Sequence, residues 1–333
     1  MRGVKVIKIL MALVLSVCIW SGGYGGKGDG LSILWEQEGN RVSAAETTGK
    51  GKKGSPGDTS GKGGGPYKAP EFADAVFHED KADDYGVVKL DVSAVNQGYV
   101  AVSCIADHRL KFQVMKDDAT YNYDMESDGT PAVFPLQSGD GVYDFRIMEN
   151  VVDTKYAELY SVSQDVKLDD EFQPFIRPSN YVKYDQNSNC VKKAQELAQD
   201  AGDTMGMVQA VYNYICDNVK YDKEKAKSIK KGYLPNPDET FASGKGICFD
   251  YAALAAAMLR SQGIPVKVIF GNVAPKDLYH AWNMFYTKET GWVTVKYEVK
   301  GNQWNRLDLT FAANGADGDF IGDGSNYTDV YSY

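Results

Sequence analysis

The stretch "SGKGICFDYAALAAAMLRSQGIP", from Ser243 to Pro265, carries most of the information about this fold. It places one cysteine, Cys248, between a glycine-rich turn and a run of strong helix formers that is apolar almost all the way round. Gly244 and Gly246 can adopt backbone angles that other residues avoid, which allows a sharp entry into a helix. Gly263, followed by a proline, is placed to end that helix. The stretch therefore predicts a buried helix that starts near Cys248.

A cysteine at the start of a helix is favoured as an anion. The first turn has N–H groups without backbone partners, and the positive end of the helix dipole lies there, so a thiolate is stabilised. We expect Asp250 to stabilise this first turn and not to take part in catalysis. Because buried thiols are common and usually inert, Cys248 needs partners before it can act as a nucleophile.

The partners of a thiolate nucleophile are a base and a group that orients the base. His280 is the one histidine in this half of the chain, and it lies in the strand-like run "LYHAWNMFY". Two further strand-like runs begin at Gly291 and Gln303, and the second carries Asp308. In the order Cys248, His280, Asp308, the imidazole would take the thiol proton while the carboxylate orients the ring.

Three segments resemble the successive blocks of the transglutaminase-like superfamily, whose core resembles papain-like cysteine proteases. They are "GKGICFDYAALAAAMLRSQGIPVKVIFG", "HAWNMFY" and "RLDLTF", and "VKYD" and "PDETFASGKG" also match the family pattern. The resemblance covers residues 188–313. It implies that Cys248 is the nucleophile, that His280 is the general base and acid, and that Asp308 is the orienting carboxylate. It also implies an α+β core in which helices pack on an antiparallel sheet.

The sequence departs from the family pattern around Asp308. The family often has a proline directly after this aspartate, where this chain has Leu309, and the preceding connection is longer by "VKYEVKGNQW". Glu298 is therefore an alternative partner for the histidine. The oxyanion would be met by the backbone N–H of the nucleophile and one further donor. By resemblance alone, the candidates for that donor are Tyr221 and Trp282.

The first half of the chain consists of short runs in which apolar and polar residues alternate. This period of two predicts half-buried strands, and turn signals rich in Gly, Asn and Asp separate them. The runs are 87–92, 99–104, 110–115, 121–125, 142–148 and 156–166. Together they predict an antiparallel β-sandwich of roughly seven strands. No titratable cluster in it has a catalytic pattern, and we expect His108 to be a loop residue.

From Ser188 onward the hydrophobic period becomes helical. A first helix has its cap at Ser188 or Asn189 and ends at Gly202. A second helix presents an apolar face that we expect to be core: Val208, Val211, Tyr212, Ile215 and Val219. A final strand is expected around residues 327–333. The chain is thus divided into an export region (1–45), a Gly/Lys/Ser-rich linker (46–68), a β-sandwich domain (69–178) and a transglutaminase-like domain (179–333).

The N-terminus "MRGVKVIKILMALVLSVCIWSGG" has a basic region followed by a short apolar run. This run is shorter than a typical membrane span, so it predicts an export signal and a secreted or cell-surface protein. An uncleaved anchor is one alternative. Lipidation of Cys18 is another, although Val17 stands where a lipoprotein box has a small residue.

The remaining cysteines form no C-x-x-C pair, which argues against a zinc ribbon and a dithiol redox motif. In an exported chain Cys190 and Cys216 could form a disulfide; the alternative is isolated buried thiols.

A metal site made by Cys248, His280 and Asp308 lacks paired ligand spacing. The acidic segment near the C-terminus lacks the order of an EF-hand. We therefore predict no metal and no cofactor.

The net charge of −9 argues against a nucleic-acid partner, because such binding requires clustered Lys and Arg. We expect an exported cysteine enzyme that acts on amide bonds of peptides, proteins or cell-wall peptides through a thioester. Water as acceptor would make it a peptidase or amidase, and an amine would make it a transglutaminase. The alternative is a cell-surface binding or structural module that keeps the fold without turnover. Contact with a membrane is expected only through an uncleaved signal or a lipid anchor.

Overall fold

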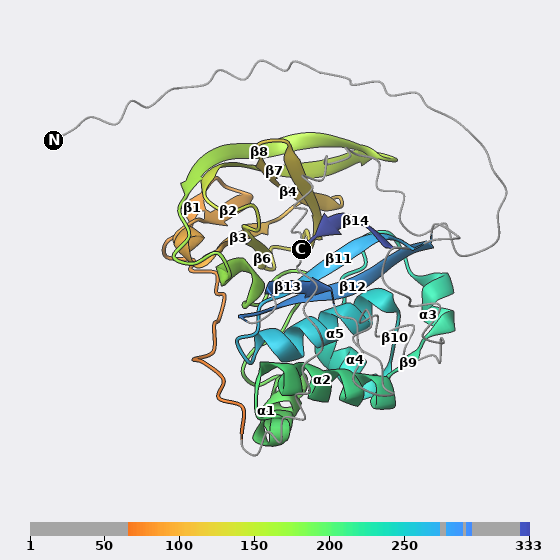
Figure 1. The fold of residues 1–333 in the computed structure, drawn as a ribbon. Coiled ribbons are helices and arrows are strands. Elements are labelled where there is room, and N and C mark those ends of the chain that lie inside the picture. The colour runs from red at the N-terminus through yellow and green to blue at the C-terminus, as the bar shows by residue number, and fades with distance from the viewer. Residues whose placement is uncertain (1–65, 274–277, 289–290, 295–326) are drawn as a thin grey trace, which may run out of the picture.

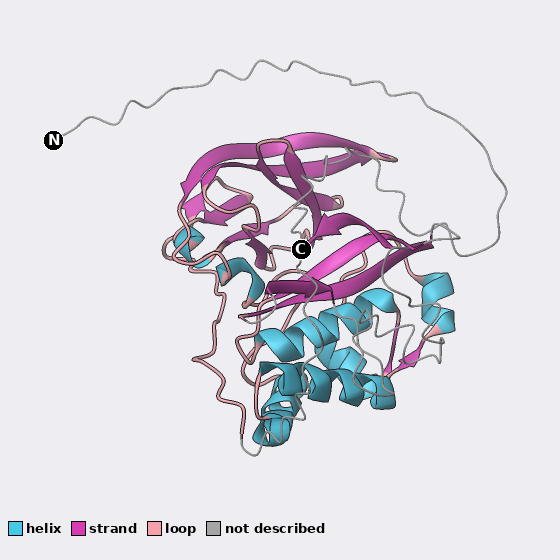
Figure 2. Ribbon diagram, in the orientation of Figure 1, coloured by secondary structure: helices cyan, strands magenta, loops and turns pink. Residues whose placement is uncertain are grey.

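The computed structural model describes residues 66–273, 278–288, 291–294 and 327–333. The predicted export region and most of the linker lie outside these residues. Figures 1 and 2 show a layer of helices on one side of a central sheet and further strands on the other, so the predicted α+β class is confirmed. Within the described residues, no helix has the length and apolar character needed to cross a membrane.

The predicted antiparallel β-sandwich consists of two four-stranded sheets. The first has the order β1-β2-β3-β6, with β1 (Asp83–Asp84), β2 (Val88–Asp91), β3 (Tyr99–Cys104) and β6 (Ala132–Pro135). The second has the order β5-β4-β7-β8, with β5 (Ala119–Met125), β4 (Leu110–Lys116), β7 (Gly141–Val152) and β8 (Lys155–Val166). The rings of Phe112 and Phe134 are 4.5 Å apart between centroids, so the sheets pack face to face. The short strands β1 and β6 were not predicted.

The second half of the chain contains the helices and the central sheet. The helices are α1 (Asn189–Ala201), α2 (Thr204–Asn218), α3 (Lys223–Ser228), α4 (Pro237–Ser243) and α5 (Cys248–Arg260). The central sheet is antiparallel and has the order β13-β12-β11-β14, with β11 (Val266–Val273), β12 (Leu278–Thr287), β13 (Gly291–Thr294) and β14 (Tyr327–Ser332). A short parallel pair joins β9 (Lys220–Tyr221) to β10 (Lys245–Gly246). Two 3-10 helices, η1 (Val95–Gln97) and η2 (Gln173–Phe175), precede α1.

These elements confirm the predicted helices and the strand around "LYHAWNMFY". The apolar face predicted for α2 is buried as expected. Strands also form at Gly291 and at residues 327–332, while the strand predicted from Gln303 lies outside the described residues.

Helix α5 is enclosed on both sides, which explains its apolar sequence. It packs against α1, α2 and α4 on one side and against β11 and β12 on the other (Figure 1). Every residue from Phe249 to Arg260 is buried. The run of alanines lets the neighbouring elements approach closely, because a methyl group occupies little space. The predicted helix start at Cys248 is confirmed, and Gly263 has a left-handed φ of 73° in the turn that follows.

The N-terminus of α1 is capped by a side chain distant in the sequence. Ser188 is the N-cap residue, but its side chain makes no cap hydrogen bond. Instead the Asp238 carboxylate, in the first turn of α4, accepts the N–H groups of Asn189 and Cys190, each at 2.8 Å. The cap therefore ties α1 to α4.

The possible disulfide between Cys190 and Cys216 is absent. None of the four cysteines in the described part of the chain forms a disulfide: Cys104, Cys190, Cys216 and Cys248. Cys190 is fully buried in the first turn of α1, where burial and contact with Asp238 raise the pKa of its thiol well above the usual range. The two residues are therefore thiols, of which Cys190 is buried and Cys216 is half-buried.

Aromatic rings join the β-sandwich to the central sheet. Tyr333 follows β14 and is 5% exposed. Its ring lies 5.1 Å from that of Tyr123 in β5 and 5.5 Å from that of Phe270 in β11. One hydrophobic core therefore continues from the sandwich into the layer that holds α5.

Replacing Leu254 by alanine should lower the free energy of unfolding by about 2–5 kcal/mol, because this fully buried side chain loses its transfer energy and leaves a cavity. Leu159 of β8 is 39% exposed, so Leu159→Ala should change stability by no more than about 0.5 kcal/mol. Urea denaturation monitored by circular dichroism measures both values. Equal losses in the two variants would contradict the enclosed position of α5.

The Asp238 cap should make stability depend on pH. Burial acts to raise the pKa of Asp238, but the N–H groups of Cys190 and Asn189 outweigh it and hold the pKa below its ordinary value of 3.8. A carboxyl with a depressed folded-state pKa stabilises the fold above its unfolded pKa, and this contribution is lost as the pH falls through the folded value.

Asp238→Asn should therefore cost about 1 kcal/mol at neutral pH. The difference from wild type should shrink below about pH 4 and vanish in stronger acid. Urea midpoints across this pH range measure the effect. Asp118→Asn, in an exposed turn, is the control and should stay within about 0.5 kcal/mol of wild type at each pH. A pH-independent difference for Asp238→Asn would show that the charge of the cap is unimportant.

Candidate functional site

Cys248 is the first residue of α5, and its side chain is half-buried. The chain enters α5 from β10 through Ile247, which has an extended conformation. Gly244 has a left-handed φ of 61°, as the sequence predicts. Gly246 does not need a special backbone angle, so that expectation is wrong. It is a close-packing position, because a Cβ there would lie 2.7 Å from the Cβ of Asp250.

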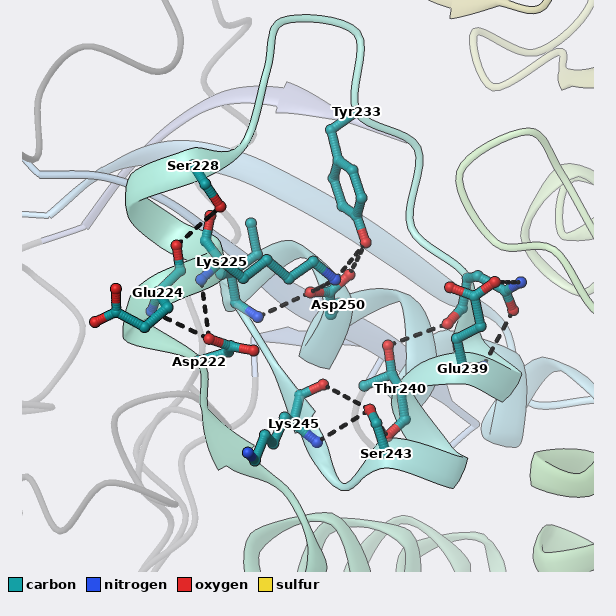
Figure 3. Close-up of polar contacts among 12 residues, drawn as sticks. Asp222, Glu224, Lys225, Ser228, Tyr233, Glu239, Thr240, Ser243, Lys245 and Asp250 are labelled. Atoms are coloured by element: carbon teal, nitrogen blue, oxygen red, sulfur yellow. Dashed lines mark hydrogen bonds and ion pairs between the residues drawn. The ribbon is translucent and has the colours of Figure 1, made fainter.

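Asp250 has the structural role that the sequence predicts. It is fully buried, and its Oδ2 accepts the N–H of Ile247 at 2.8 Å. This bond satisfies one of the backbone donors at the start of α5. Lys225 and Tyr233 also contact this carboxylate (Figure 3). The first turn that carries Cys248 is therefore fixed by polar contacts.

His280 lies in β12, directly opposite Gly271 of β11, and is 5% exposed. Helix α5 packs on this strand, and the Asn283 amide donates to the carbonyl of Ala252 at 3.1 Å. The fold thus brings together the elements that carry Cys248 and His280. The pairing of their two side chains remains a prediction.

Two tyrosines lie within electrostatic range of the Cys248 thiol. Burial, with smaller contributions from Cys248 and Asp250, raises the pKa of Tyr221 in β9 to about 12. Burial, with contributions from Tyr331 and Cys248, raises the pKa of Tyr279 in β12 well above its ordinary value. Both phenols are therefore neutral hydrogen-bond donors near neutral pH.

The structure distinguishes the two residues suggested as oxyanion donors. Tyr221 interacts electrostatically with the Cys248 thiol, and the ring of Trp282 lies 6.5 Å between centroids from that of His280, so each residue borders one member of the candidate pair. Tyr279 was not singled out from the sequence, although its position next to His280 was an available signal.

Asp308 and its alternative Glu298 lie outside the described residues, so the third member of the triad stays a prediction. His108 lies in a loop, as expected, with its Nδ1 3.2 Å from a carboxylate oxygen of Glu149. In the part of the chain that the structure describes, no three His, Cys, Asp or Glu side chains gather as a possible metal site.

Comparison with known proteins identifies the class of this part of the chain. Residues 191–297 match the family model of the transglutaminase-like superfamily, so they form a transglutaminase-like domain. The match contains Cys248 and His280 and ends before Asp308. The resemblance seen in the sequence is therefore confirmed for the cysteine and histidine blocks.

Individual relatives are distant. UPF0252 protein MJ1282 of Methanocaldococcus jannaschii is 33% identical over 67 residues, which are 19% of this chain and 19% of the relative. A candidate cysteine protease from Cytophaga hutchinsonii has 16% identity and a TM-score of 0.36, over 71% of this chain and 79% of its own. LapG of Legionella pneumophila has 15% identity and a TM-score of 0.29, over 44% and 70%. With TM-scores this low, the assignment depends on the family match and not on these structures.

Proposed function

We propose that the protein is an exported cysteine enzyme that acts on amide bonds through a thioester on Cys248. The observation that carries the proposal is the position of Cys248 at the N-terminus of α5, which packs directly on the strand that bears His280. A helix N-terminus stabilises a thiolate, and the family match covers both residues.

The chemistry divides into two acyl-transfer steps. His280 accepts the thiol proton, and the thiolate of Cys248 attacks the carbonyl carbon of the amide. The tetrahedral oxyanion is stabilised by the backbone N–H of Cys248, with the neutral Tyr221 phenol as the proposed second donor. The intermediate collapses as the C–N bond breaks, the imidazolium gives its proton to the leaving amine, and a thioester remains. Water or an amine then attacks the thioester and restores the thiol.

Peptides or proteins are the proposed substrates, with cell-wall peptides among them because we expect export. The β-sandwich would then position the enzyme or recruit the partner that carries the scissile bond. This assignment of the sandwich is an inference from architecture.

The first test is the pH dependence of alkylation at Cys248. Wild-type protein should be labelled by iodoacetamide at Cys248 well below about pH 7, because a thiolate–imidazolium pair reacts where an ordinary thiol does not. In His280→Ala this rapid labelling should disappear. Peptide mass spectrometry resolves Cys248 from Cys216, which is also a half-buried thiol outside any disulfide and is the internal control. Identical profiles for the two cysteines in wild type would overturn the proposal.

Turnover should depend on the same residues. We expect Cys248→Ala and His280→Ala to lose at least about a thousandfold in rate, since neither nucleophile nor base has a substitute. Asp308→Asn should lose less, because orientation is impaired while both remain. A defined peptide mixture, assayed for new amino termini and for incorporation of a fluorescent primary amine, separates hydrolysis from transfer. Cys216→Ala should retain full activity. Unchanged turnover in Cys248→Ala would instead favour a binding module.

A further inference from the structure

Asp250 is a fully buried carboxylate that is contacted by donors from three segments. Its Oδ2 accepts the N–H of Ile247 at 2.8 Å and lies 2.7 Å from the Nζ of Lys225. Its Oδ1 accepts the hydroxyl of Tyr233 at 2.5 Å. A buried carboxylate without partners is very costly, and these donors supply the hydrogen bonds and the opposite charge that it requires. Figure 3 shows the ends of Lys225 and Tyr233 converging on Asp250.

The two side-chain donors come from outside α5. Lys225 belongs to α3, and Tyr233 lies in the loop between α3 and α4. The Nζ of Lys225 also donates to the Tyr233 hydroxyl at 2.6 Å and lies 4.6 Å from the centre of its ring. Each of the three groups therefore contacts the other two. We call Lys225, Tyr233 and Asp250 the Asp250 cluster; it fastens α3 and the following loop to the first turn of α5.

The Asp250 cluster lies beside the candidate nucleophile, because Cys248 and Asp250 share the first turn of α5. A carboxylate two residues from Cys248 opposes a thiolate, and it also uses one of the N–H groups at the start of the helix. The ammonium of Lys225 offsets this negative charge. Tyr233 remains a neutral donor, because burial and the Asp250 carboxylate raise the pKa of its phenol well above its ordinary value.

The packing leaves little room for Asp250 to move. Gly246 lies against it so closely that a Cβ would reach 2.7 Å from the Asp250 Cβ. Gly246 is paired in register with Tyr221, which lies within electrostatic range of Cys248. A displaced Asp250 would therefore disturb both the first turn of α5 and the strand pair beside the thiol.

The other ionisable groups around the site come from β9, α4 and β12. Tyr221 and Tyr279 are neutral near neutral pH, as any phenol is, and burial raises the pKa of both further. Glu239 of α4 adds to the negative potential at Tyr233. His280 is the proposed base. Lys225 is the cation in direct contact with Asp250, whereas Lys220 of β9 and Lys245 of β10 are exposed.

We propose that Lys225 and Tyr233 are positioning residues for Cys248, which neutralise Asp250 and fix the first turn of α5 so that the thiolate can form. This inference rests on the proposed function, because it concerns the same nucleophile. It adds two residues, from a segment outside α5 and β12, to the groups on which the reactivity of Cys248 depends.

The test is the alkylation profile of Cys248 in Lys225→Met, measured with iodoacetamide from about pH 5 to about pH 9 on the full chain. Methionine is unbranched and one atom shorter than lysine, so it keeps most of the side-chain volume and removes the charge. At pH values below the midpoint of the profile, we expect the alkylation rate of Cys248 to fall about tenfold. This fall corresponds to a displacement of the profile by about one unit toward higher pH. Tyr233→Phe removes one hydrogen bond and should shift the profile in the same direction by less.

Matched variants separate this role from a general effect on folding. Lys227→Met is the control, because Lys227 lies on the same helix with its ammonium paired to the exposed Glu224. It should leave the profile of Cys248 unchanged. Lys225→Arg keeps the cation and should restore most of the wild-type rate. Cys104 and Cys190 are fully buried, so their labelling in the same digest reports any variant that unfolds.

A double variant tests whether Lys225 acts through Asp250. If Lys225 fixes the first turn of α5 through its contact with the Asp250 carboxylate, an Asp250→Asn background removes that route, so adding Lys225→Met there should displace the profile much less than it does in wild type. An equal displacement in both backgrounds would contradict the proposed route through Asp250.

Failure of this inference differs from failure of the proposed function. Suppose that the Cys248 alkylation profiles of Lys225→Met and Tyr233→Phe both coincide with that of wild type while Cys104 and Cys190 stay protected from alkylation. The positioning role is then overturned, and Cys248 keeps its assignment as the nucleophile. If the alkylation profile of Cys248 in the wild-type protein already matches that of Cys216, the proposed function fails, and the positioning role fails with it. If Lys225→Met unfolds, the milder Tyr233→Phe decides by the same criterion.

Discussion

The enclosure of α5 is the constraint on which the rest of the structure depends. Its body is buried between α1, α2 and α4 on one side and β11 and β12 on the other, so its direction is fixed by packing from every side. Close-packed interiors allow little displacement. The first residue of this helix is therefore held in one place relative to β12. A reactive group at that position gains a fixed geometry from the packing of the whole helix, to which the contacts of Asp250 in the first turn are added.

Both ends of α5 carry a buried charge that is satisfied by other segments. At the N-terminus Asp250 is contacted by Lys225 and Tyr233. At the C-terminus the guanidinium of Arg260 donates to the carbonyls of Val266, Arg177 and Tyr333. An acid at the start and a base at the end also complement the helix dipole. The buried charges thus tie the helix to α3, β11, the end of the chain and the segment after the sandwich.

The β-sandwich reaches the candidate site through the loop that carries Tyr233. Gly232, the preceding residue, lies against the guanidinium of Arg109, because a Cβ there would be 3.1 Å from its Nε. Arg109 is itself held by Asp124 of β5, with Nε donating at 2.9 Å. The loop is therefore packed between the sandwich and the first turn of α5. This arrangement gives the sandwich a physical connection to the environment of Cys248.

The sequence by itself determined the strands with a period of two, the apolar face of α2, and the start of α5 at Cys248, because these features follow from local periodicity and propensity. It also indicated the transglutaminase-like class and the residues Cys248 and His280 from short blocks.

The tertiary structure alone decided which distant groups satisfy the buried polar atoms. The cap on α1 comes from Asp238, the partners of Asp250 are Lys225 and Tyr233, and Gly246 is needed for close approach and not for its backbone angle. Cys190 and Cys216 remain thiols although the sequence allowed a disulfide. These outcomes depend on where separate elements meet in space, and a linear pattern does not specify that.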